Sequence, residues 1–526
     1  MPMACDLHKW MLRPIHTWLR CGSGNTVLKP CRAARPGWRT GRPRPAAAAL
    51  MASPGRLAAM RLSPLRVLVL AIAVAGCAGT ATPGTVATPA PGTARSSTAA
   101  GTARYTPATT GAWDWPVYHH DPARSGYAAA TLPAGPLSIA WTRRLDGAVY
   151  GQPLAIGGLV IVATEGDSVY GLDRTTGAVR WRAHLGTPVP LSSLPCGDID
   201  PLGITGTPVY SPATGLVYAV AETAGYRHML AGVSITSGRV RFMRDIPTPD
   251  GQPRFDQQRA ALALAGGRVY VAFGGLDGDC GQYRGSVVGA PASGSGPLVS
   301  YLVPTARGGG IWATGGPVVG PGGTIYVSIG NGAATQAPFD GSDSVTALSA
   351  DLHRAGIFAP AVWAADNAAD LDLGSMSPAV LPSGLILAAG KRGTGYLLDG
   401  SRLGGVAGQA AAAQVCQAYG GPSVRGTVAY IPCGDGGTAA VDTAGRRIHV
   451  LWRGPPTAAG SPVLGGGAVW VTDWGAGTLY QLDMATGHVR HQIALGSPLP
   501  HFASPSLSGR LVLIGTMSGV VAVSGA

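Results

Sequence analysis

Side chains that can do chemistry are scarce in this chain of 526 residues. Glu165 and Glu222 are its only glutamates, each directly after an apolar segment, and Lys391 is the only lysine beyond residue 29. Converging carboxylates suit Ca²⁺, and charged side chains in a cavity suit a small polar cofactor. We therefore take Glu165, Glu222 and Lys391 as candidate cofactor-binding residues, with Asp370 and Asp372 as weaker candidates. The alternatives are solvated turns for the two glutamates and a surface position for Lys391.

Motifs of standard catalytic and metal sites are missing from the sequence. It has no C-x-x-C-H haem motif, no H-E-x-x-H zinc motif, no G-x-S-x-G nucleophile elbow and no Walker A loop. His119, His120 and Asp121 are adjacent, but the neighbouring segments 113–118 and 124–126 favour an N-terminal clasp against the folded domain over a metal site. The motifs therefore name no catalytic residue and no metal ligand.

Glycine and proline indicate the fold class. The chain has 80 glycines and 43 prolines, about twice the usual share of these two residues. Neither is tolerated in the interior of a helix, which excludes a mostly helical protein. The hydrophobic content of 46% supports a sizeable core. Many short strands joined by glycine-rich turns, an all-β fold, fit best.

The net charge of +13 does not indicate nucleic-acid binding. Residues 1–66 hold 12 basic residues and one acidic residue, so the rest of the chain carries 27 basic and 25 acidic residues. That remainder has no basic stripe with interleaved aromatic residues, which a nucleic-acid binder would show. We expect no nucleic-acid partner.

The basic N-terminal region contains an export signal. Residues 60–77 combine Arg61 and Arg66, a short apolar run and a terminal Val-Ala-Gly-Cys. The run, about ten residues, is too short to span a bilayer and has the layout of a secretory signal. Its ending resembles the lipobox of bacterial lipoproteins. This implies lipidation of Cys77, a membrane anchor and a location on the outer face of the cell membrane; an incidental cysteine in a plain signal peptide is the alternative.

Two further segments adjoin this signal. Because signal peptides begin at the N-terminus, we interpret residues 1–59 as an extension before the true start, at Met60 or Met51. Residues 78–112 are rich in Thr, Ala, Pro and Gly and have almost no large apolar side chain, so they cannot bury a core. We interpret them as a disordered tether and assign the folded domain to residues 113–526.

The folded domain is built from repeats. A proline introduces an apolar strand at seven places, after a small residue at six of them and after Gln152 at the first, and an eighth copy has alanine instead. These positions are Pro153, Pro208, Ala261, Pro317, Pro378, Pro422, Pro462 and Pro505. A second motif, SVYGLDRTTGAVRWR at 168–182 and TLYQLDMATGHVRHQ at 478–492, predicts strand, turn and strand. Eight units of about 40–60 residues with four strands each predict an eight-bladed β-propeller.

The combined pattern resembles the repeat of the pyrroloquinoline-quinone (PQQ) type β-propeller family over residues 137–526. The matching elements are small-Pro, an apolar strand, Val-Tyr-Val and Tyr-x-Leu-Asp-x-x-Thr-Gly-x-Val-x-Trp, best preserved at 151–182 and 461–490. That family includes quinoprotein alcohol dehydrogenases and non-catalytic lipoproteins, among them an outer-membrane assembly factor. The resemblance implies the fold and leaves both kinds of function open.

The last repeat has room for only three strands. Residues 137–145 resemble the fourth strand of the repeat, so we expect them to complete the last blade and close the ring, which removes two open edges. Long insertions at 183–205, 246–259, 274–285, 331–343, 359–376 and 403–420 are then expected on one face. Insertions gathered on one face commonly mark a binding surface.

Four cysteines follow Cys77, and they permit three pairings. Cys196 and Cys280 fall in loops of the same face on neighbouring blades. Cys416 precedes the sixth blade, and Cys433 follows its second strand on that face. We predict the disulfides Cys196–Cys280 and Cys416–Cys433, which suit an exported protein.

These observations predict an exported, lipid-anchored, non-catalytic β-propeller that binds a protein, peptide or carbohydrate on its loop-rich face. The alternative, which the resemblance implies, is a PQQ- and calcium-dependent alcohol or sugar dehydrogenase, in which Ca²⁺ polarises the quinone and an aspartate accepts the proton. Many such enzymes carry an adjacent Cys-Cys pair against the quinone, and this sequence has none. We expect no cofactor, with PQQ and calcium only under the alternative.

Overall fold

The computed structural model describes residues 111–129 and 135–525. The expected signal segment at 60–77 with Cys77, the extension at 1–59 and nearly all of the tether at 78–112 lie outside the described residues. None of the helices described is long and apolar enough to cross a membrane.

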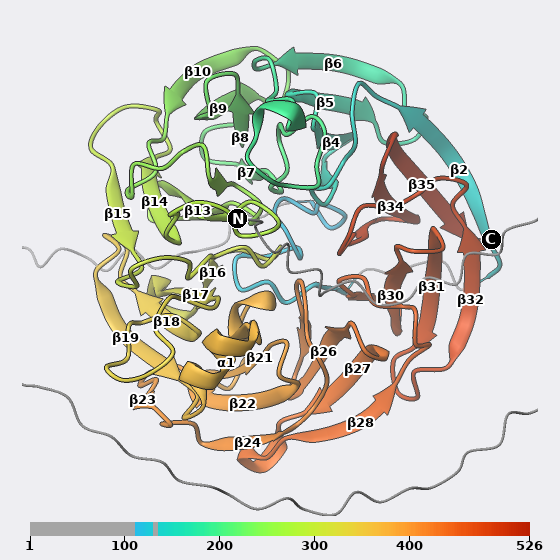
Figure 1. Ribbon diagram of the computed structural model, residues 1–526. Helices are drawn as coiled ribbons and strands as arrows, with labels where there is room; N and C mark the ends of the chain where they lie inside the picture. The colour runs from blue at the N-terminus through green and yellow to red at the C-terminus, as the bar shows by residue number, and fades with distance from the viewer. Residues whose placement is uncertain (1–110, 130–134, 526) are drawn as a thin grey trace, which may run out of the picture. The chain divides into compact units, whose positions relative to one another are not determined.

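Eight antiparallel sheets form within the described residues, and they surround one axis as the blades of a propeller (Figure 1). The innermost strands, in blade order, are β3 (Leu154–Ile156), β7 (Val209–Ser211), β12 (Ala263–Ala265), β16 (Val318–Val319), β20 (Ala379–Val380), β25 (Ser423–Arg425), β29 (Val463–Gly465) and β33 (Ser506–Ser508). The second strands are β4 (Leu159–Thr164), β8 (Leu216–Thr223), β13 (Arg268–Gly275), β17 (Ile325–Ile329), β21 (Leu385–Ala389), β26 (Val428–Cys433), β30 (Ala468–Asp473) and β34 (Leu511–Thr516).

The two outer strands complete each blade. The third strands are β5 (Ser168–Asp173), β9 (Arg227–Ser234), β14 (Ser286–Pro291), β18 (Ser344–Leu348), β22 (Thr394–Asp399), β27 (Gly437–Asp442), β31 (Thr478–Asp483) and β35 (Gly519–Gly525). The outermost strands are β6 (Val179–His184), β10 (Val240–Asp245), β15 (Val299–Leu302), β19 (Arg354–Ala359), β24 (Ala411–Gln414), β28 (His449–Arg453), β32 (Val489–Ala494) and β2 (Leu137–Arg144).

A few short elements add to the blades. They are the strands β1 (Tyr127–Ala128), β11 (Asp256–Gln257) and β23 (Gly405–Val406), the helix α1 (Trp363–Ala369), and the 3-10 turns η1 (Leu191–Ser193), η2 (Pro321–Gly323), η3 (Leu373–Ser375) and η4 (Ala444–Arg446).

The eighth blade confirms the predicted closure of the ring. Its strand order is β2-β35-β34-β33, so one N-terminal strand completes three C-terminal strands. Trp141 on β2 pairs with Ala522 on β35, and its indole Nε1 donates to the Arg174 carbonyl of blade 1 at 3.0 Å. The fold class is therefore confirmed as an all-β, eight-bladed propeller.

Tryptophans on the outermost strands join successive blades. As Trp141 does from blade 8 to blade 1, Trp181 donates to the Ile235 carbonyl of blade 2 at 3.0 Å. The glycine of the Thr-Gly turn is required at this contact. At Gly177 φ is +67°, and a Cβ there would lie 2.5 Å from the Trp141 ring. The motif that marks the repeat in the sequence is therefore the joint between blades.

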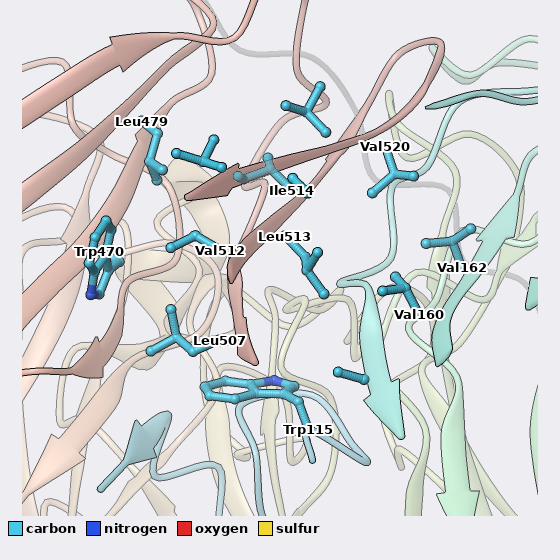
Figure 2. Packing of buried hydrophobic residues seen from close by; sticks show 14 of the residues in the cluster. Trp115, Val160, Val162, Trp470, Leu479, Leu507, Val512, Leu513, Ile514 and Val520 are labelled. Atoms are coloured by element: carbon cyan, nitrogen blue, oxygen red, sulfur yellow. The ribbon is translucent and has the colours of Figure 1, made fainter. Parts of the chain in front are cut away.

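Aliphatic and aromatic side chains fill the spaces between sheets. Figure 2 shows the cluster that blades 7, 8 and 1 share, with Trp115 and Trp470, neither exposed to solvent, beside Val160, Leu513 and Ile514. Burial of side chains of this size contributes about 1.5–3 kcal/mol each to folding.

The N-terminal segment 113–128 is the clasp that the sequence predicts, and it lies at the centre of the ring (Figure 1). Trp115 exchanges backbone hydrogen bonds with Ala155 of β3, and β1 runs parallel to β29. Hydrogen bonds also link the segment to five further blades. The bonded pairs are Pro116 with Tyr210, Pro122 with Val319, Arg124 with Leu262, Ser125 with Val424 and Trp113 with Ser508. The segment therefore ties the inner strands of seven blades together.

His119 belongs to this clasp and does not mark a metal site. Its Nδ1 lies 2.9 Å from the Pro422 carbonyl oxygen and its Nε2 lies 3.0 Å from Ser504 Oγ, while the ring stacks on Tyr118 at 4.2 Å. Burial lowers the pKa of His119 to about 3, so the imidazole is neutral at physiological pH. Both ring nitrogens are thus used structurally.

Two details of the sequence prediction were wrong. The residue that directly precedes β12, the place of proline in the other repeats, is Leu262 and not Ala261. Residues 400–410 lie between the third and fourth strands of blade 5, because β24 is its outermost strand. The sequence of β24, AAAQ, lacks the Trp and Thr-Gly signals of the other outer strands, so the sequence pattern places it within the insertion at 403–420. This part of the insertion is therefore on the opposite face.

Candidate functional site

The loops that lead into the inner strands surround a cavity of about 360 Å³ on the propeller axis. It lies on the face for which the sequence predicts the long insertions, with the clasp toward the other end. Its principal lining residues are Tyr150, Asp198, Arg259, Asp277, Tyr283, Trp312, Asn331, Asp372, Lys391, Tyr419, His501 and Phe502. Its volume is within the usual range for small-molecule sites, about 300–1,000 Å³.

Aromatic rings form much of the cavity wall. Tyr419 and Phe502 stack with ring centroids 6.0 Å apart, and Trp312 lies 6.3 Å from Phe502. His501 is 6.1 Å from the same phenylalanine. Such a wall offers flat apolar faces to a ring-shaped ligand.

Lys391 lies in the wall of this cavity. Its Nζ is 2.8 Å from Asp370 Oδ1 and 2.8 Å from Asp372 Oδ2, and 5.8 Å from the Trp312 ring centroid. Burial lowers the pKa of Lys391, but Asp372 and Asp370 outweigh this and raise it above its usual range. Burial raises the pKa of Asp372 even though Lys391 opposes it. The weaker candidates Asp370 and Asp372 are thus brought together with Lys391 as one ion-pair cluster.

Glu165 and Glu222 do not line the cavity; each braces the loop that leads into the next blade. Glu165 Oε2 accepts from the Gly203 amide at 2.7 Å and from Thr205 Oγ1 at 3.2 Å. Glu222 Oε1 accepts from the Gln258 amide, and its Oε2 is 3.6 Å from His228 Nε2. Both glutamates are buried, so neither is a solvated turn residue.

Burial changes the ionisation of the acids in this layer. It raises the pKa of Glu165 to about 8, and Asp167, two residues on and fully buried, has its pKa raised to about 8 by burial and by the nearby Glu165 and Glu222. At neutral pH these two carboxyls are therefore largely protonated in the folded protein.

A calcium and quinone site would need carboxylates in the cavity wall, where Asp198, Asp277 and Asp279 are exposed and Asp372 is buried. Ca²⁺ takes six to eight oxygen ligands, usually with several carboxylates. Of the buried carboxylates, Asp372 is in the wall, but its oxygens are taken by Lys391 and by the Asn331 amide. In the part of the chain that the structure describes, the single group of three side chains close enough to share an ion is Cys416, Cys433 and Asp435, and its two cysteines are bonded to each other.

Both predicted disulfides are present. Cys196–Cys280 joins the loop before blade 2 to a loop of blade 3, next to cavity residues Asp198 and Asp277. Cys416–Cys433 joins the loop between β24 and Tyr419 to the end of β26. Each bridge holds a loop on the cavity face.

Arg259, Trp312 and Tyr419 are site residues that the sequence reading missed. Arg259 stacks over Tyr150 at 5.5 Å and donates from Nη2 to the His501 carbonyl at 3.0 Å. The repeat does contain a signal for Arg259 and Tyr419, but not for Trp312. In four of the blades, the residue four positions before the first residue of the inner strand lines the cavity. These residues are Tyr150, Arg259, Tyr419 and Phe502.

The fold and the site together define a PQQ-like eight-bladed β-propeller with an axial cavity. A family model described as outer membrane protein assembly factor BamB matches residues 137–276 and 361–493, about half of the chain. The chain belongs to this family of PQQ-like β-propellers.

Solved structures with the same fold include two alcohol dehydrogenases and BamB. Quinohemoprotein alcohol dehydrogenase from Comamonas testosteroni is 15% identical, with 78% of this chain and 80% of that chain covered and a TM-score of 0.60. A europium-containing methanol dehydrogenase is 14% identical, with 79% and 98% covered and a TM-score of 0.60. BamB from Moraxella catarrhalis is 15% identical, with 74% and 97% covered and a TM-score of 0.50. No curated protein sequence matches the chain.

Proposed function

We propose that this protein is an exported, lipid-anchored β-propeller that binds a ligand in its axial cavity without transforming it. The observation that carries the proposal is the cavity itself, because loops from most blades converge there and supply aromatic faces and charged groups. A volume of about 360 Å³ fits a sugar unit or one residue of a peptide. Family membership supports a binding role, since the family model bears the name of an assembly factor.

A ligand screen tests this proposal. Thermal unfolding of the purified full-length protein is followed in the presence of mono- and oligosaccharides, short peptides and PQQ with Ca²⁺. A cavity ligand raises the melting temperature by mass action, and Trp312→Ala should reduce that shift. Trp113→Ala is the control, because Trp113 is 53% exposed and outside the cavity. The proposal fails if no compound stabilises the protein, or if both variants respond as the wild type does.

The alternative is a PQQ-dependent dehydrogenase, which the folds of the quinoprotein neighbours and the Lys391–Asp372 pair in the wall favour. Against it, Glu165 and Glu222 bond to backbone amides outside the cavity. We expect no dye-linked oxidation of alcohols or sugars after addition of PQQ and Ca²⁺. Turnover that is lost in Asp372→Asn and retained in Asp351→Asn, an exposed carboxylate elsewhere, would replace the binding proposal by the enzyme.

Export and anchoring rest on the sequence of residues 60–77. Cys77→Ala should move the protein from the membrane to the soluble fraction, because the acyl chains are its expected anchor. A Cys77→Ala variant that remains as firmly bound to the membrane as the wild type would refute lipidation.

A further inference from the structure

Arg259 has no ion-pair partner in the described part of the chain, and Glu165 and Asp198 act on its charge only from beyond ion-pair distance. No carboxylate there lies at ion-pair distance from its guanidinium, whereas Arg182 and Arg490 on the surface pair with aspartates at 2.6 and 2.5 Å. Its described contacts are one hydrogen bond to the His501 carbonyl and the face of Tyr150. The Arg259 side chain is partly buried, and an anion that forms paired hydrogen bonds with its guanidinium offsets the partial loss of hydration.

The acidic residue behind Arg259 does not neutralise it. Burial raises the pKa of Glu165 to about 8, so most of this carboxyl is uncharged at neutral pH. Burial lowers the pKa of Arg259 itself, but a guanidinium remains charged in proteins. The wall at this point therefore carries the positive charge of Arg259, which the exposed carboxylate of Asp198 offsets only in part and from beyond ion-pair distance.

Other polar groups in the wall are also donors without an acceptor among the described residues. The hydroxyl of Tyr150, the hydroxyl of Tyr419 and the indole Nε1 of Trp312 line the cavity and make no hydrogen bond there. In contrast, Trp141 and Trp181, at the joints between blades, each donate to a carbonyl. Burial raises the pKa of Tyr150 to about 12, which keeps this hydroxyl a donor at neutral pH.

Free acceptors are on the exposed side of the cavity. Asp198 and Asp277 are exposed and have no hydrogen-bond donor among the described residues, whereas both oxygens of Asp372 are occupied. Burial and the negative charges of Asp198 and Asp279 raise the pKa of Asp277. A ligand that fits this arrangement has an acceptor-rich anionic end at Arg259 and donor hydroxyls toward the aspartates.

We propose that the ligand of the axial cavity is a sugar acid, whose carboxylate binds Arg259 and whose ring stacks on the aromatic wall. This inference rests on the proposed binding function and specifies its ligand class. The ring hydroxyls donate to the outer aspartates and accept from the Tyr150, Tyr419 and Trp312 donors. A neutral sugar lacks the group that compensates Arg259, and a simple anion lacks the ring.

Titration calorimetry with two matched probes tests the proposal. Glucuronate and glucose share a ring and differ in the carboxylate, so the full-length protein should bind glucuronate at least tenfold more tightly. Arg259→Gln should weaken glucuronate binding tenfold or more and leave glucose unaffected. Arg254→Gln is the control, because Arg254 also stacks on a tyrosine, Tyr226 at 5.5 Å, and donates to a carbonyl, that of Ser193, but lies outside the cavity.

The outcomes distinguish failure of the sugar-acid inference from failure of the proposed binding function. Equal binding of glucose and glucuronate, or equal losses in Arg259→Gln and Arg254→Gln, overturns the sugar-acid inference and leaves the cavity as a binding site. Tighter binding of the peptide carboxylate acetyl-Gly-Gly than of glucuronate overturns the sugar part. The melting temperature of ligand-free Arg259→Gln provides a readout without ligand: it should be no lower than that of Arg254→Gln. A marked decrease in Arg259→Gln alone would make Arg259 structural and overturn the inference.

Discussion

The two ends of the propeller axis are built in opposite ways. At one end the clasp of residues 113–128 bonds to the inner strands, and Trp115, Tyr118 and His119 are buried with their polar atoms paired. At the other end, Arg259 in the cavity wall has no ion-pair partner and one hydrogen bond, to the His501 carbonyl, and the Tyr419 hydroxyl has no hydrogen-bond partner among the described residues. Burial of an unpaired polar group is unfavourable. The clasp end, whose polar atoms are paired, therefore stabilises the fold, while the cavity end, with its unpaired groups, is open to a ligand.

The same comparison explains why the carboxylates do not meet at the axis. Glu165 directly follows β4, whereas Glu222 lies within β8, one residue before its end, and each turns to the amide of the next loop. They form a layer behind the cavity wall that positions Gly203 and Gln258. The ligand-facing positions belong instead to residues on the loops that they brace.

The largest expected effect concerns the open end. Replacement of Cys196 and Cys280 by serine should lower the free energy of unfolding by about 4–5 kcal/mol, since the bridge closes a loop with a sequence separation of 84 residues. Denaturant unfolding of the double variant measures the loss. Peptide mapping without reductant should recover the Cys196–Cys280 and Cys416–Cys433 peptides. Free thiols or crossed pairs would contradict both bridges.

The next effect concerns the closed end. Trp115→Ala should destabilise the protein by about 3–5 kcal/mol, because the side chain is fully buried and its Nε1 donates to Gln152 Oε1 at 2.9 Å. Trp113→Ala, two residues away and 53% exposed, should cost less than about 1 kcal/mol. Equal losses in the two variants would mean that the clasp is not a cooperative part of the fold.

The sequence predicts the fold better than the site, for a physical reason. Blade number, closure by residues 137–145 and the two disulfides follow from periodic features, because Trp181 and the Thr-Gly turn recur wherever blades pack on each other. The direction in which a carboxylate turns is not periodic. Glu165 could face the axis or the next loop, and the amide of Gly203 decides this through a contact 38 residues away. Arg259 shares its repeat position with Tyr150, Tyr419 and Phe502, but no residue type recurs there in all blades, so the repeat marks the position and not its chemistry.

Protonation of Glu165, in the layer behind the cavity wall, gives a third prediction. The folded protein retains the proton of Glu165 up to about pH 8, whereas the usual value for the unfolded chain is about 4.5. The contribution of this group is therefore complete below about pH 4.5 and is lost as the pH rises toward 8. Glu165→Gln cannot ionise and should have a smaller decrease in melting temperature between pH 5 and pH 8. Asp351→Asn, at an exposed carboxylate, should keep the wild-type slope; if Glu165→Gln keeps it too, Glu165 is ionised in the folded state.

The smallest expected effect is the most direct test of the comparison, because it makes one chemical change at both ends. Tyr118 is buried, and its hydroxyl lies 3.2 Å from Thr314 Oγ1, so Tyr118→Phe removes a hydrogen bond and should cost about 1 kcal/mol. Tyr419 lines the cavity, and its hydroxyl has no partner in residues 111–129 and 135–525, so Tyr419→Phe should leave the free energy of unfolding unchanged. The order should be reversed for ligand affinity, which Tyr419→Phe lowers and Tyr118→Phe does not. If Tyr419→Phe and Tyr118→Phe lower the free energy of unfolding equally, the two ends are built alike. This result would contradict the assignment of the cavity as the binding site.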